Sequence, residues 1–345
     1  MSITINLIYK ATLGRITGLE RDALIVEQAL KPYHHKFNHY KITERRFFKK
    51  YKIPQSLVSK ANAFFKTRIH KFDINIFFER IRPELCELAN LNLFIPNQEM
   101  FHKSQLPLLR DMDLILCKTR YAERIFQKIA NNVEYIGFKS MDRLTKELRK
   151  DYNSFLHIAG KSSYRRGTSQ ILDLWTRHAD FPQLNVIAHG FNSEDYTNYP
   201  NIKIFNDYIP DQLLKKLQNQ AGIHLCLSES EGFGHFIMEG LSCGSCVVTT
   251  NGKPMNELVE SDRGYLVDCN RIEPEEKKFS EKFFFDPVNL EEKILQILAD
   301  SDQEKINKSQ KARQYFKKNE EIFHSNLIGI INSLIPISKN IVTIE

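Results

Sequence analysis

The residues best placed to do chemistry lie in one stretch, SESEGFGHFIMEGLSCGSCVVTTNGKPMN, at positions 228–256 of the 345-residue chain. Its pattern predicts a buried strand, a glycine turn, a helix and a second strand: Ile223–Leu227, Glu231–Gly234, His235–Cys243 and Cys246–Thr249. This succession is one unit of a doubly wound sheet, in which ligands bind beyond the carboxyl ends of the strands. The glycine turn is therefore a candidate ligand site.

The chemistry of the turn favours an anion flanked by hydroxyl groups. Gly232 and Gly234 allow the backbone to approach a ligand, and the N–H groups that open the following helix suit a phosphate. Glu231 and Glu239 flank that point, with a rise of about 7.5 Å from Gly234 to Glu239. The two carboxylates suit the ribose and the hexose on either side of a diphosphate. Alternatively, Glu231 complements the helix dipole and Glu239 is a solvated helix residue.

The same stretch resembles a known family. Glu231-Gly-Phe-Gly-x4-Glu239 resembles the E-x7-E element of retaining GT-B glycosyltransferases, family 4 in particular. The flanking sequences Ser242–Val248 and Gly264–Val267 resemble the family's "ACGxPVV" and "G-h-L-V" patterns, with Cys246 where the family usually has Pro. The resemblance covers residues 155–270. It implies that Glu231, Gly232, Phe233, Gly234 and Glu239 bind the donor, Glu231 through sugar hydroxyls and Glu239 through the ribose.

A second loop places two cations before a helix. A strand is expected over Phe155–Ala159, then a loop as far as Thr168 and a helix to Ala179. By resemblance, Lys161 and Arg166 occupy the family's Arg and Lys positions, and Gly160 and Ser162 also belong to the donor loop. Two cations in a loop that opens a helix can clamp a diphosphate. The alternative is that both are ordinary surface cations.

Other donor contacts follow from position within the family. Tyr208 and Ile209, in the sequence Asn206–Pro210, resemble the loop beside the nucleobase. Gly14 and Arg15 follow the expected first strand, Ile3–Tyr9, where the resemblance places a loop that faces the donor phosphate.

Candidate acceptor residues lie at strand ends in the N-terminal half. Glu79 ends the expected strand Asp73–Phe78, and Asn97, Gln98 and Glu99 follow Leu91–Ile95. Polar residues at these ends of an α/β sheet are site candidates. Many family 4 enzymes place a His here, whereas this chain has His102 further on. The predicted acceptor side is Glu79, Asn97, Glu99 and His102, and the predicted catalytic residues are Glu231, Lys161, Arg166 and Glu99. A turn held by Asn97 is the alternative.

Length and patterning predict an α/β protein of about two domains. The resemblance implies the GT-B fold, in which two Rossmann-like domains face each other across a cleft. The expected boundaries are 1–150 for an acceptor-side domain, 151–318 for a nucleotide-sugar-binding domain and 319–345 for a C-terminal helix that crosses back. Residues 138–150 are expected to be a charged linker, and residues 303–316 and 322–337 two helices.

Composition favours an ordinary globular protein, with 42% hydrophobic and 26% charged residues. No apolar run reaches the ~18 residues of a membrane span, and Met1–Tyr9 lacks the features of a signal peptide. The six scattered cysteines favour a reduced, cytoplasmic location, and Cys243-Gly-Ser-Cys246 is interpreted as packing.

The charge is uneven along the chain. Residues 1–150 carry 28 Lys and Arg against 15 Asp and Glu, net +13, and the remainder carries 21 against 27, net −6. The stretch Lys31–Lys71 holds twelve Lys and Arg, four His and one acid, Glu44. A solvated helical face is the plainest interpretation. The alternatives are contact with an anionic acceptor or with an anionic membrane at its inner face, and no nucleic-acid partner is expected.

These observations together predict retaining transfer of a hexose from a UDP- or GDP-sugar to a glycan, lipid-linked or other hydroxyl acceptor, as in glycan biosynthesis. The resemblance implies a front-face mechanism without a protein nucleophile. No metal and no cofactor is expected, since no Asp-x-Asp strand end occurs. Two alternatives stay open at this point: a nucleotide-sugar epimerase of the same fold, and a non-catalytic protein that docks on a membrane or polymer.

Overall fold

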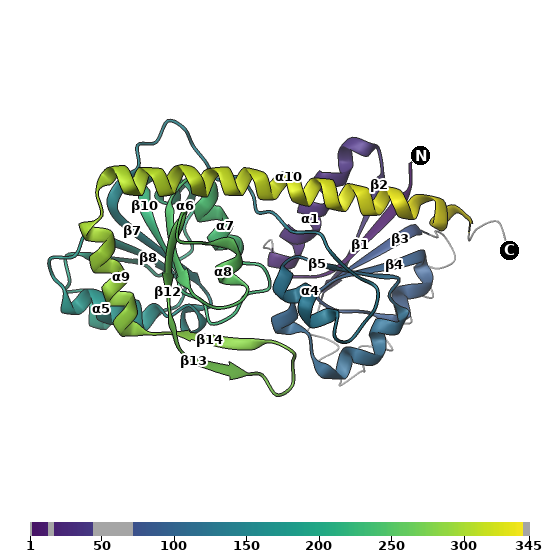
Figure 1. The fold of residues 1–345 in the computed structure, drawn as a ribbon, viewed down its shortest axis with the longest axis horizontal. Coiled ribbons are helices and arrows are strands. Elements are labelled where there is room, and N and C mark those ends of the chain that lie inside the picture. Colours follow the sequence, from purple (N-terminus) through teal and green to yellow (C-terminus); the bar gives the residue numbers. More distant parts are fainter. Residues whose placement is uncertain (1, 13–16, 44–71, 341–345) are drawn as a thin grey trace. The chain divides into compact units, whose positions relative to one another are not determined.

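The structure, a computed structural model, describes residues 2–12, 17–43 and 72–340, and their side chains as far as residue 336. Contacts divide the chain into two compact units (Figure 1). The first unit contains Met1–Phe138, Glu276–Phe279 and Glu321–Glu345. The second contains Lys139–Glu275 and Ser280–Glu320.

The first unit is built on a parallel six-stranded sheet in the order β2-β1-β3-β4-β5-β6. The strands are β1 (Thr4–Ala11), β2 (Lys36–Thr43), β3 (Phe72–Phe78), β4 (Ala89–Ile95), β5 (Leu114–Cys117) and β6 (Val133–Tyr135). The helices are α1 (Gly18–Leu30) and α4 (Arg120–Phe126), with 3-10 segments at Lys31–Tyr33, Pro83–Leu88, Gln98–Met100 and Lys103–Asp111. Thr17 and Thr119 cap α1 and α4 with their hydroxyl oxygens, as the sequence predicts for Thr119.

The second unit repeats this plan with a parallel six-stranded sheet in the order β12-β11-β10-β7-β8-β9. Its strands are β7 (Asp151–Gly160), β8 (Leu184–Ala188), β9 (Ile202–Phe205), β10 (Ala221–Cys226), β11 (Cys246–Thr250) and β12 (Gly264–Val267). Its helices are α5 (Thr168–Arg177), α6 (Asp211–Gln220), α7 (His235–Ser242), α8 (Met255–Leu258) and α9 (Pro287–Ala299), with 3-10 turns at Ser163–Arg165 and Glu194–Tyr196.

Helices cover both faces of the second sheet. Alternate strand residues point to opposite sides, and the apolar side chains on each side are buried against helices. Phe155 of β7 packs in a core with Trp175 of α5 and Ile294 of α9, whereas its neighbour Leu156 packs with Leu217 of α6. The strands are therefore nearly continuous apolar runs, as expected for a parallel sheet buried on both sides. The prediction of two Rossmann-like α/β halves is confirmed.

Each sheet has a point at which the strand order reverses. In the first unit the chain passes from β1 to β2 on one side and then returns to β3 on the other. In the second unit it runs from β7 through β8 to β9, and β10 then returns to the opposite side of β7. Ligands of doubly wound sheets bind at such points, beyond the carboxyl ends of the strands. The sites to inspect are thus the ends of β1 and β3 and the ends of β7 and β10.

Several local predictions differ from the structure. Residues 302–340 form one helix, α10 (Asp302–Asn340), and not two. An antiparallel hairpin, β13 (Cys269–Pro274) and β14 (Glu281–Phe285), lies where the sequence predicts no element. The short helix expected near residue 83 is the 3-10 segment Pro83–Leu88. Residues 44–71 of the basic stretch lie outside the described residues.

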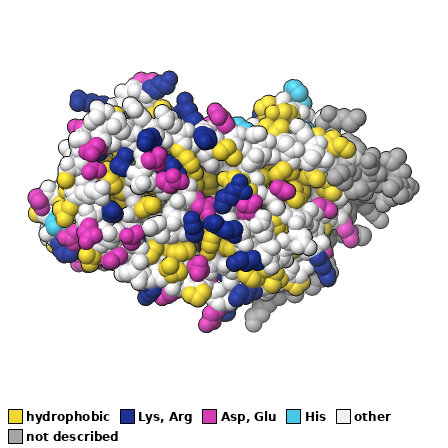
Figure 2. All heavy atoms as spheres, viewed as in Figure 1, with side chains coloured by type: hydrophobic (Ala, Val, Ile, Leu, Met, Phe, Trp, Pro, Cys, Tyr) yellow, Lys and Arg dark blue, Asp and Glu magenta, His cyan; other side chains and the backbone are white. Residues whose placement is uncertain are grey.

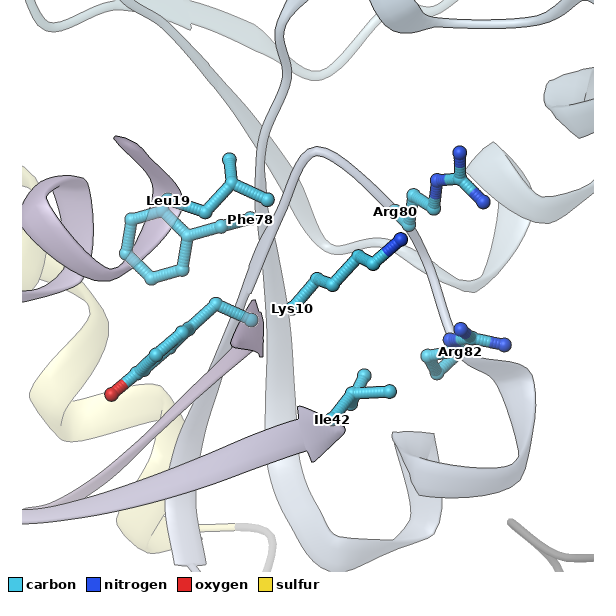
Figure 3. A pocket seen from close by; sticks show the side chains of 7 residues that line it. Lys10, Leu19, Ile42, Phe78, Arg80 and Arg82 are labelled. Atoms are coloured by element: carbon cyan, nitrogen blue, oxygen red, sulfur yellow. The ribbon is translucent and has the colours of Figure 1, made fainter. Parts of the chain in front are cut away.

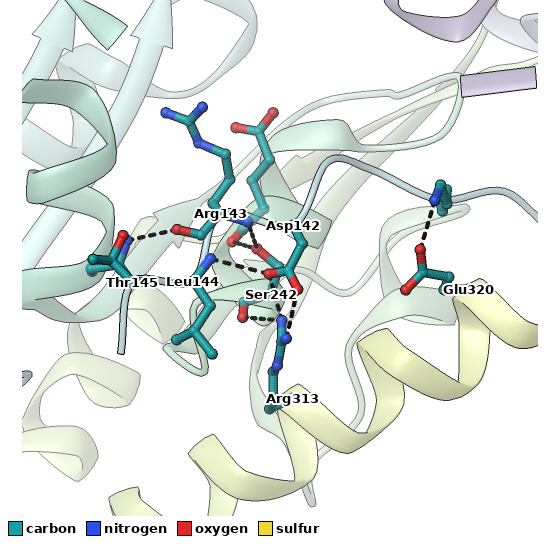
Figure 4. Close-up of polar contacts among 10 residues, drawn as sticks. Asp142, Arg143, Leu144, Thr145, Ser242, Arg313 and Glu320 are labelled. Carbon is teal, nitrogen blue, oxygen red and sulfur yellow. Dashed lines mark hydrogen bonds and ion pairs between the residues drawn. The ribbon is translucent and has the colours of Figure 1, made fainter. Parts of the chain in front are cut away.

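The expected linker 138–150 is also different, because from Lys139 on it is anchored on the second unit (Figure 4). The guanidinium of Arg313 donates to both carboxylate oxygens of Asp142, at 2.6 and 2.7 Å. The N–H of Arg143 donates to Ser242 Oγ at 3.0 Å, and Lys139 pairs with Glu320 at 2.6 Å. The charges of Lys139 and Asp142 are thus fixed in contacts, so the segment is not a free linker.

Candidate functional site

The reversal point of the second unit brings two predicted loops together, 160–167 after β7 and 227–234 after β10. The N–H of Glu229 donates to the carbonyl oxygen of Arg165 at 3.0 Å. Arg165 Nη2 donates in turn to Ser230 Oγ at 3.0 Å. The hairpin supports the second loop, since the N–H of Phe283 donates to the carbonyl of Glu229 at 2.8 Å. The sequence does not predict these contacts between the loops, because the residues that make them are far apart along the chain.

Arg166 is held at the junction of these loops. Its Nη1 donates to the carbonyl oxygen of Ile158 at 2.7 Å, and its guanidinium carbon lies 4.1 Å from the centre of the Phe236 ring. Nη2 lies 4.0 Å from Glu231 Oε1. The side chain is still about one fifth exposed (21%), so a ligand can reach it. Lys161 lies in the same loop and is exposed.

Helix α7 starts at this junction without a side-chain cap. Gly234 is its N-cap residue, with φ of 107°, and as a glycine it has no side chain that could cap the helix. A Cβ on Gly234 would meet Leu258 Cδ1 at 3.1 Å, so glycine is required both for the conformation and for the packing. The N–H groups that open the helix are therefore presented beside Arg166, where they and the helix dipole favour an anion.

The two glutamates of the predicted motif have different environments. Glu231 is partly buried and accepts a hydrogen bond from Ser228 Oγ at 2.7 Å. Glu239 is 7% exposed and accepts from Gln218 Nε2 at 2.9 Å. Glu239 is thus a buried carboxylate in an element of otherwise apolar packing, and not a solvated helix residue. Gly232 and Phe233, between the two, are buried.

A buried histidine supports the first loop from beneath. His157 of β7 lies between the carbonyl oxygen of Leu225 and Thr168 Oγ1, at 2.9 Å from each. Burial lowers the pKa of His157 to about 4, so the ring is neutral at pH 7. It then donates from Nδ1 to Leu225 and accepts at Nε2 from Thr168, which is the first residue of α5.

An aromatic pair lies beside the loop that contains Gly160. Tyr208 is 82% exposed, and its ring stacks on His189, with centroids 5.9 Å apart and an interplanar angle of 26°. The N–H of His189 donates to the carbonyl of Gly160 at 2.8 Å, and Ile209 packs against the sheet. The sequence predicts a strand over Asn185–His189, and the position of His189 at the end of this strand could have marked it as a site candidate. Ser140, whose Oγ lies 2.7 Å from His235 Nδ1 at the start of α7, had no such signal.

In the first unit the structure joins two of the predicted acceptor residues. Asn97 Nδ2 donates to Glu79 Oε2 at 3.1 Å, and Lys118 Nζ donates to Asn97 Oδ1 at 2.5 Å. Lys118 also pairs with Asp22 at 2.9 Å, and both side chains are less than 5% exposed. Glu79 has φ of 65°, a strained conformation for a residue other than glycine. Strain and a buried ion pair at a sheet's carboxyl end are typical of functional sites.

The remaining predicted residues are placed less tightly. Glu99 lies in the 3-10 segment Gln98–Met100, and His102 forms an isolated bridge with Lys278. No described contact joins either of them to the pair of Glu79 and Asn97. Gly14 and Arg15 lie outside the described residues. Asp22 and Lys118 are the residues that sequence reasoning missed here, because Asp22 is one of several charged residues in α1 and nothing in the sequence distinguishes it.

Two findings apply to the part of the chain that the structure describes. There, no group of three or more His, Cys, Asp or Glu side chains is placed to hold a metal ion. In the same residues, no helix is long and apolar enough to cross a membrane.

Comparison with known proteins agrees with this architecture. The family described as glycosyl transferases group 1 matches residues 123–320, more than half of the chain. No curated protein matches the chain.

Solved structures show a similar fold along nearly the whole chain. A glycosyltransferase from Rickettsia africae has a TM-score of 0.71 and 15% identity, over 97% of this chain and 99% of its own. Sucrose-phosphate synthase from Thermosynechococcus elongatus has a TM-score of 0.72 and 12% identity, over 97% and 100%. HepE from Anabaena, in complex with UDP and glucose, has a TM-score of 0.66 and 13% identity, over 96% and 100%. With the family match and this likeness of fold, the chain belongs to the group 1 glycosyl transferases and is an enzyme of the GT-B fold.

Proposed function

We propose that this enzyme transfers a hexose from a UDP- or GDP-sugar to a hydroxyl acceptor with retention of the anomeric configuration, as a family 4 enzyme. The observation that carries the proposal is the position of Arg166 beside the uncapped start of α7, at the reversal point of the second sheet. A guanidinium and the backbone N–H groups at the start of a helix together suit a diphosphate. HepE, which has a similar fold, was solved with UDP and glucose.

We assign the hexose, the ribose and the nucleobase of the donor to protein residues around this diphosphate site. Glu231, 4.0 Å from Arg166, is positioned for hydroxyl groups of the hexose. Glu239, within α7, is assigned to the ribose, and the exposed ring of Tyr208 to the nucleobase, which it contacts by stacking. Lys161 and Gly160 complete the loop on the phosphate side.

The proposed reaction breaks the bond between the anomeric carbon and the β-phosphate oxygen. The acceptor oxygen forms the new bond on the same face of the sugar, and its proton passes to the leaving phosphate. Arg166, Lys161 and the start of α7 stabilise the negative charge that develops on the leaving diphosphate. We therefore propose that the reaction needs no metal ion or cofactor, because protein cations supply the charge that a metal would contribute.

The first unit is proposed to supply the acceptor side. Glu79 and Asn97, held by Lys118 and Asp22, are the groups whose geometry is fixed at its carboxyl edge. Glu99 stays a candidate catalytic residue and His102 a candidate acceptor contact. In this proposal residues 151–318 bind the donor, and residues 1–150 bind the acceptor.

The anomeric outcome tests the proposal. The chain is incubated with UDP- and GDP-linked α-hexoses, and the first sugar released to acceptor or water is analysed by proton NMR. Retention predicts the α-anomer as the initial product. An initial β-anomer would contradict the front-face mechanism while leaving sugar transfer intact. An epimerase would be recognised by a changed sugar that remains attached to the nucleotide.

A further inference from the structure

A pocket lined by basic side chains lies wholly within the first unit (Figure 3). It is a depression open to solvent, and the space within it, open solvent included, is about 390 Å³. Its lining residues are Tyr9, Lys10, Leu19, Ile42, Phe78, Arg80 and Arg82. Three of the seven carry positive charge, and the others are apolar or aromatic.

The topology of the sheet brings these residues together. Lys10, near the end of β1, is paired in register with Ile42 of β2, and Arg80 and Arg82 follow the adjacent strand β3. In Figure 3 the side chain of Lys10 extends toward the segment that carries Arg80 and Arg82, while Leu19 and Phe78 lie on the other side. The pocket therefore occupies the carboxyl edge at the reversal point between β1 and β3, where such sheets bind ligands.

The charges of Arg80 and Arg82 are only partly compensated in the described part of the chain. Arg80 lies 3.9 Å from Glu79 Oε1, a long ion pair, and its side chain is 52% exposed. Arg82 Nε is buried and has no hydrogen-bond partner in the described part of the chain. A buried donor without an acceptor is costly, and a charged one more so. An anion in the pocket, which Arg82 lines, would balance the charge of its guanidinium.

We propose that this pocket binds a phosphate group on the acceptor, an inference that rests on the proposed function. Cations that approach from two sides suit the several oxygens of a phosphate, and guanidinium groups bind phosphate with paired hydrogen bonds. The apolar lining suits the carbon skeleton attached to it. The phosphate belongs either to a soluble phosphate ester or to a phospholipid headgroup, and the test distinguishes the two.

The first arm of the test uses glycerol 3-phosphate as the soluble probe. The donor site is first filled with whichever of UDP, GDP or ADP binds, so that the probe cannot enter it, and the probe is titrated by calorimetry. Arg82→Gln and Lys10→Gln should each weaken binding about tenfold, the loss expected for one charge-assisted contact. Arg110→Gln is the matched control, because it also removes one positive charge from this unit and its side chain is 81% exposed. It should leave the affinity unchanged.

The second arm uses vesicles of phosphatidylglycerol and phosphatidylcholine in place of the soluble probe. Weaker vesicle binding by Arg82→Gln and Lys10→Gln, but not by Arg110→Gln, assigns the pocket to a lipid headgroup. The proposal is overturned if the pocket variants match the wild type, or match the control, in both arms. If Arg82→Gln does not fold, Lys10→Gln alone still tests whether the pocket binds phosphate. Failure of all three nucleotides to bind would instead refute the proposed function, and the vesicle arm would still decide the pocket.

Discussion

At the scale of single residues, the proposed donor site depends on how tightly Arg166 is held. The carbonyl of Ile158, the ring of Phe236 and the carboxylate of Glu231 surround its guanidinium. A cation that is fixed before the ligand arrives loses little conformational freedom on binding. Lys161, in the same loop but exposed, has to be ordered by the ligand.

The phosphate clamp predicts weaker binding of the free nucleoside diphosphate when either cation is removed. Arg166→Ala and Lys161→Ala should each lose roughly 1.5–3 kcal/mol, about ten- to a hundredfold in affinity, measured by calorimetry. Arg177→Ala is the control, since this residue lies at the end of α5 and is 57% exposed. Unchanged diphosphate affinity in both test variants would refute the clamp.

The two glutamates should fail in different ways. Glu231→Gln is expected to impair sugar transfer while nearly preserving nucleoside diphosphate affinity, because this carboxylate addresses the hexose. Glu239→Gln should weaken the nucleotide itself through the ribose, with the thermal midpoint measured alongside because the side chain is buried. Equal losses of diphosphate affinity in the two variants would show that this division is wrong.

Sequence could indicate candidate residues in a loop before a helix, such as Glu231, Lys161 and Arg166, because such a loop is recognisable from a short window, and their roles stay predictions. It could not indicate the partners that position them. Arg165 meets Ser230, and Asp22 meets Lys118, across 65 and 96 positions. Such pairs depend on strand order, which a single sequence does not contain.

At the scale of elements, α7 approaches the sheet closely at Gly240. A Cβ there would meet His224 Nδ1 at 2.9 Å and Val247 Cγ2 at 3.0 Å. We expect Gly240→Ala to destabilise the protein by about 1–3 kcal/mol, since overpacking outweighs the gain in helix propensity. Gly329→Ala, in α10 with nothing within 4 Å, should instead stabilise by roughly 0.5–1 kcal/mol. Urea unfolding of both variants checks this, and a stabilised Gly240→Ala variant would contradict the packing.

The buried histidines of β7 and β10 predict a loss of stability in mild acid. Burial lowers the pKa of His157 to about 4, and burial together with Lys150 lowers that of His224 to about 3. Between pH 6.5 and these values the unfolded chain binds protons that the folded chain excludes, so stability falls as the pH falls. From pH 6.5 to 4.5 each histidine should remove about 2 kcal/mol of unfolding free energy. Urea titrations should show a shallower pH slope in His224→Gln. An identical slope would mean that His224 is not excluded from protonation.

The elements themselves were predictable where their patterns were strong. Apolar runs gave the parallel strands, and Asp211–Gln220 was predicted with its observed bounds. The two expected C-terminal helices proved to be one because the polar residues between Phe316 and Ile322 include no Gly or Pro to end a helix. The hairpin of β13 and β14 was missed since much of it is exposed and charged, with little alternation to mark strands.

At the scale of the whole molecule, the positive charge is concentrated in residues 1–150. Over the second unit, on the left of Figure 2, acidic and basic side chains are interspersed on the face shown. Attraction of an anionic donor is therefore expected to come from the local cations of the donor loop and not from a broad field. In the first unit, the basic pocket is proposed to attract the acceptor in the same local way, through its phosphate group.

The most direct test of the central claim is turnover of nucleotide sugars by the full chain. Release of nucleoside diphosphate is measured with UDP-, GDP- and ADP-sugars, for the wild type and for Arg166→Ala and Arg177→Ala. The account predicts release from a UDP- or GDP-sugar by the wild type and Arg177→Ala, reduced at least tenfold in Arg166→Ala by the lost phosphate contact. Equal release by wild type and Arg166→Ala, or release from none of the three donor classes, would contradict it.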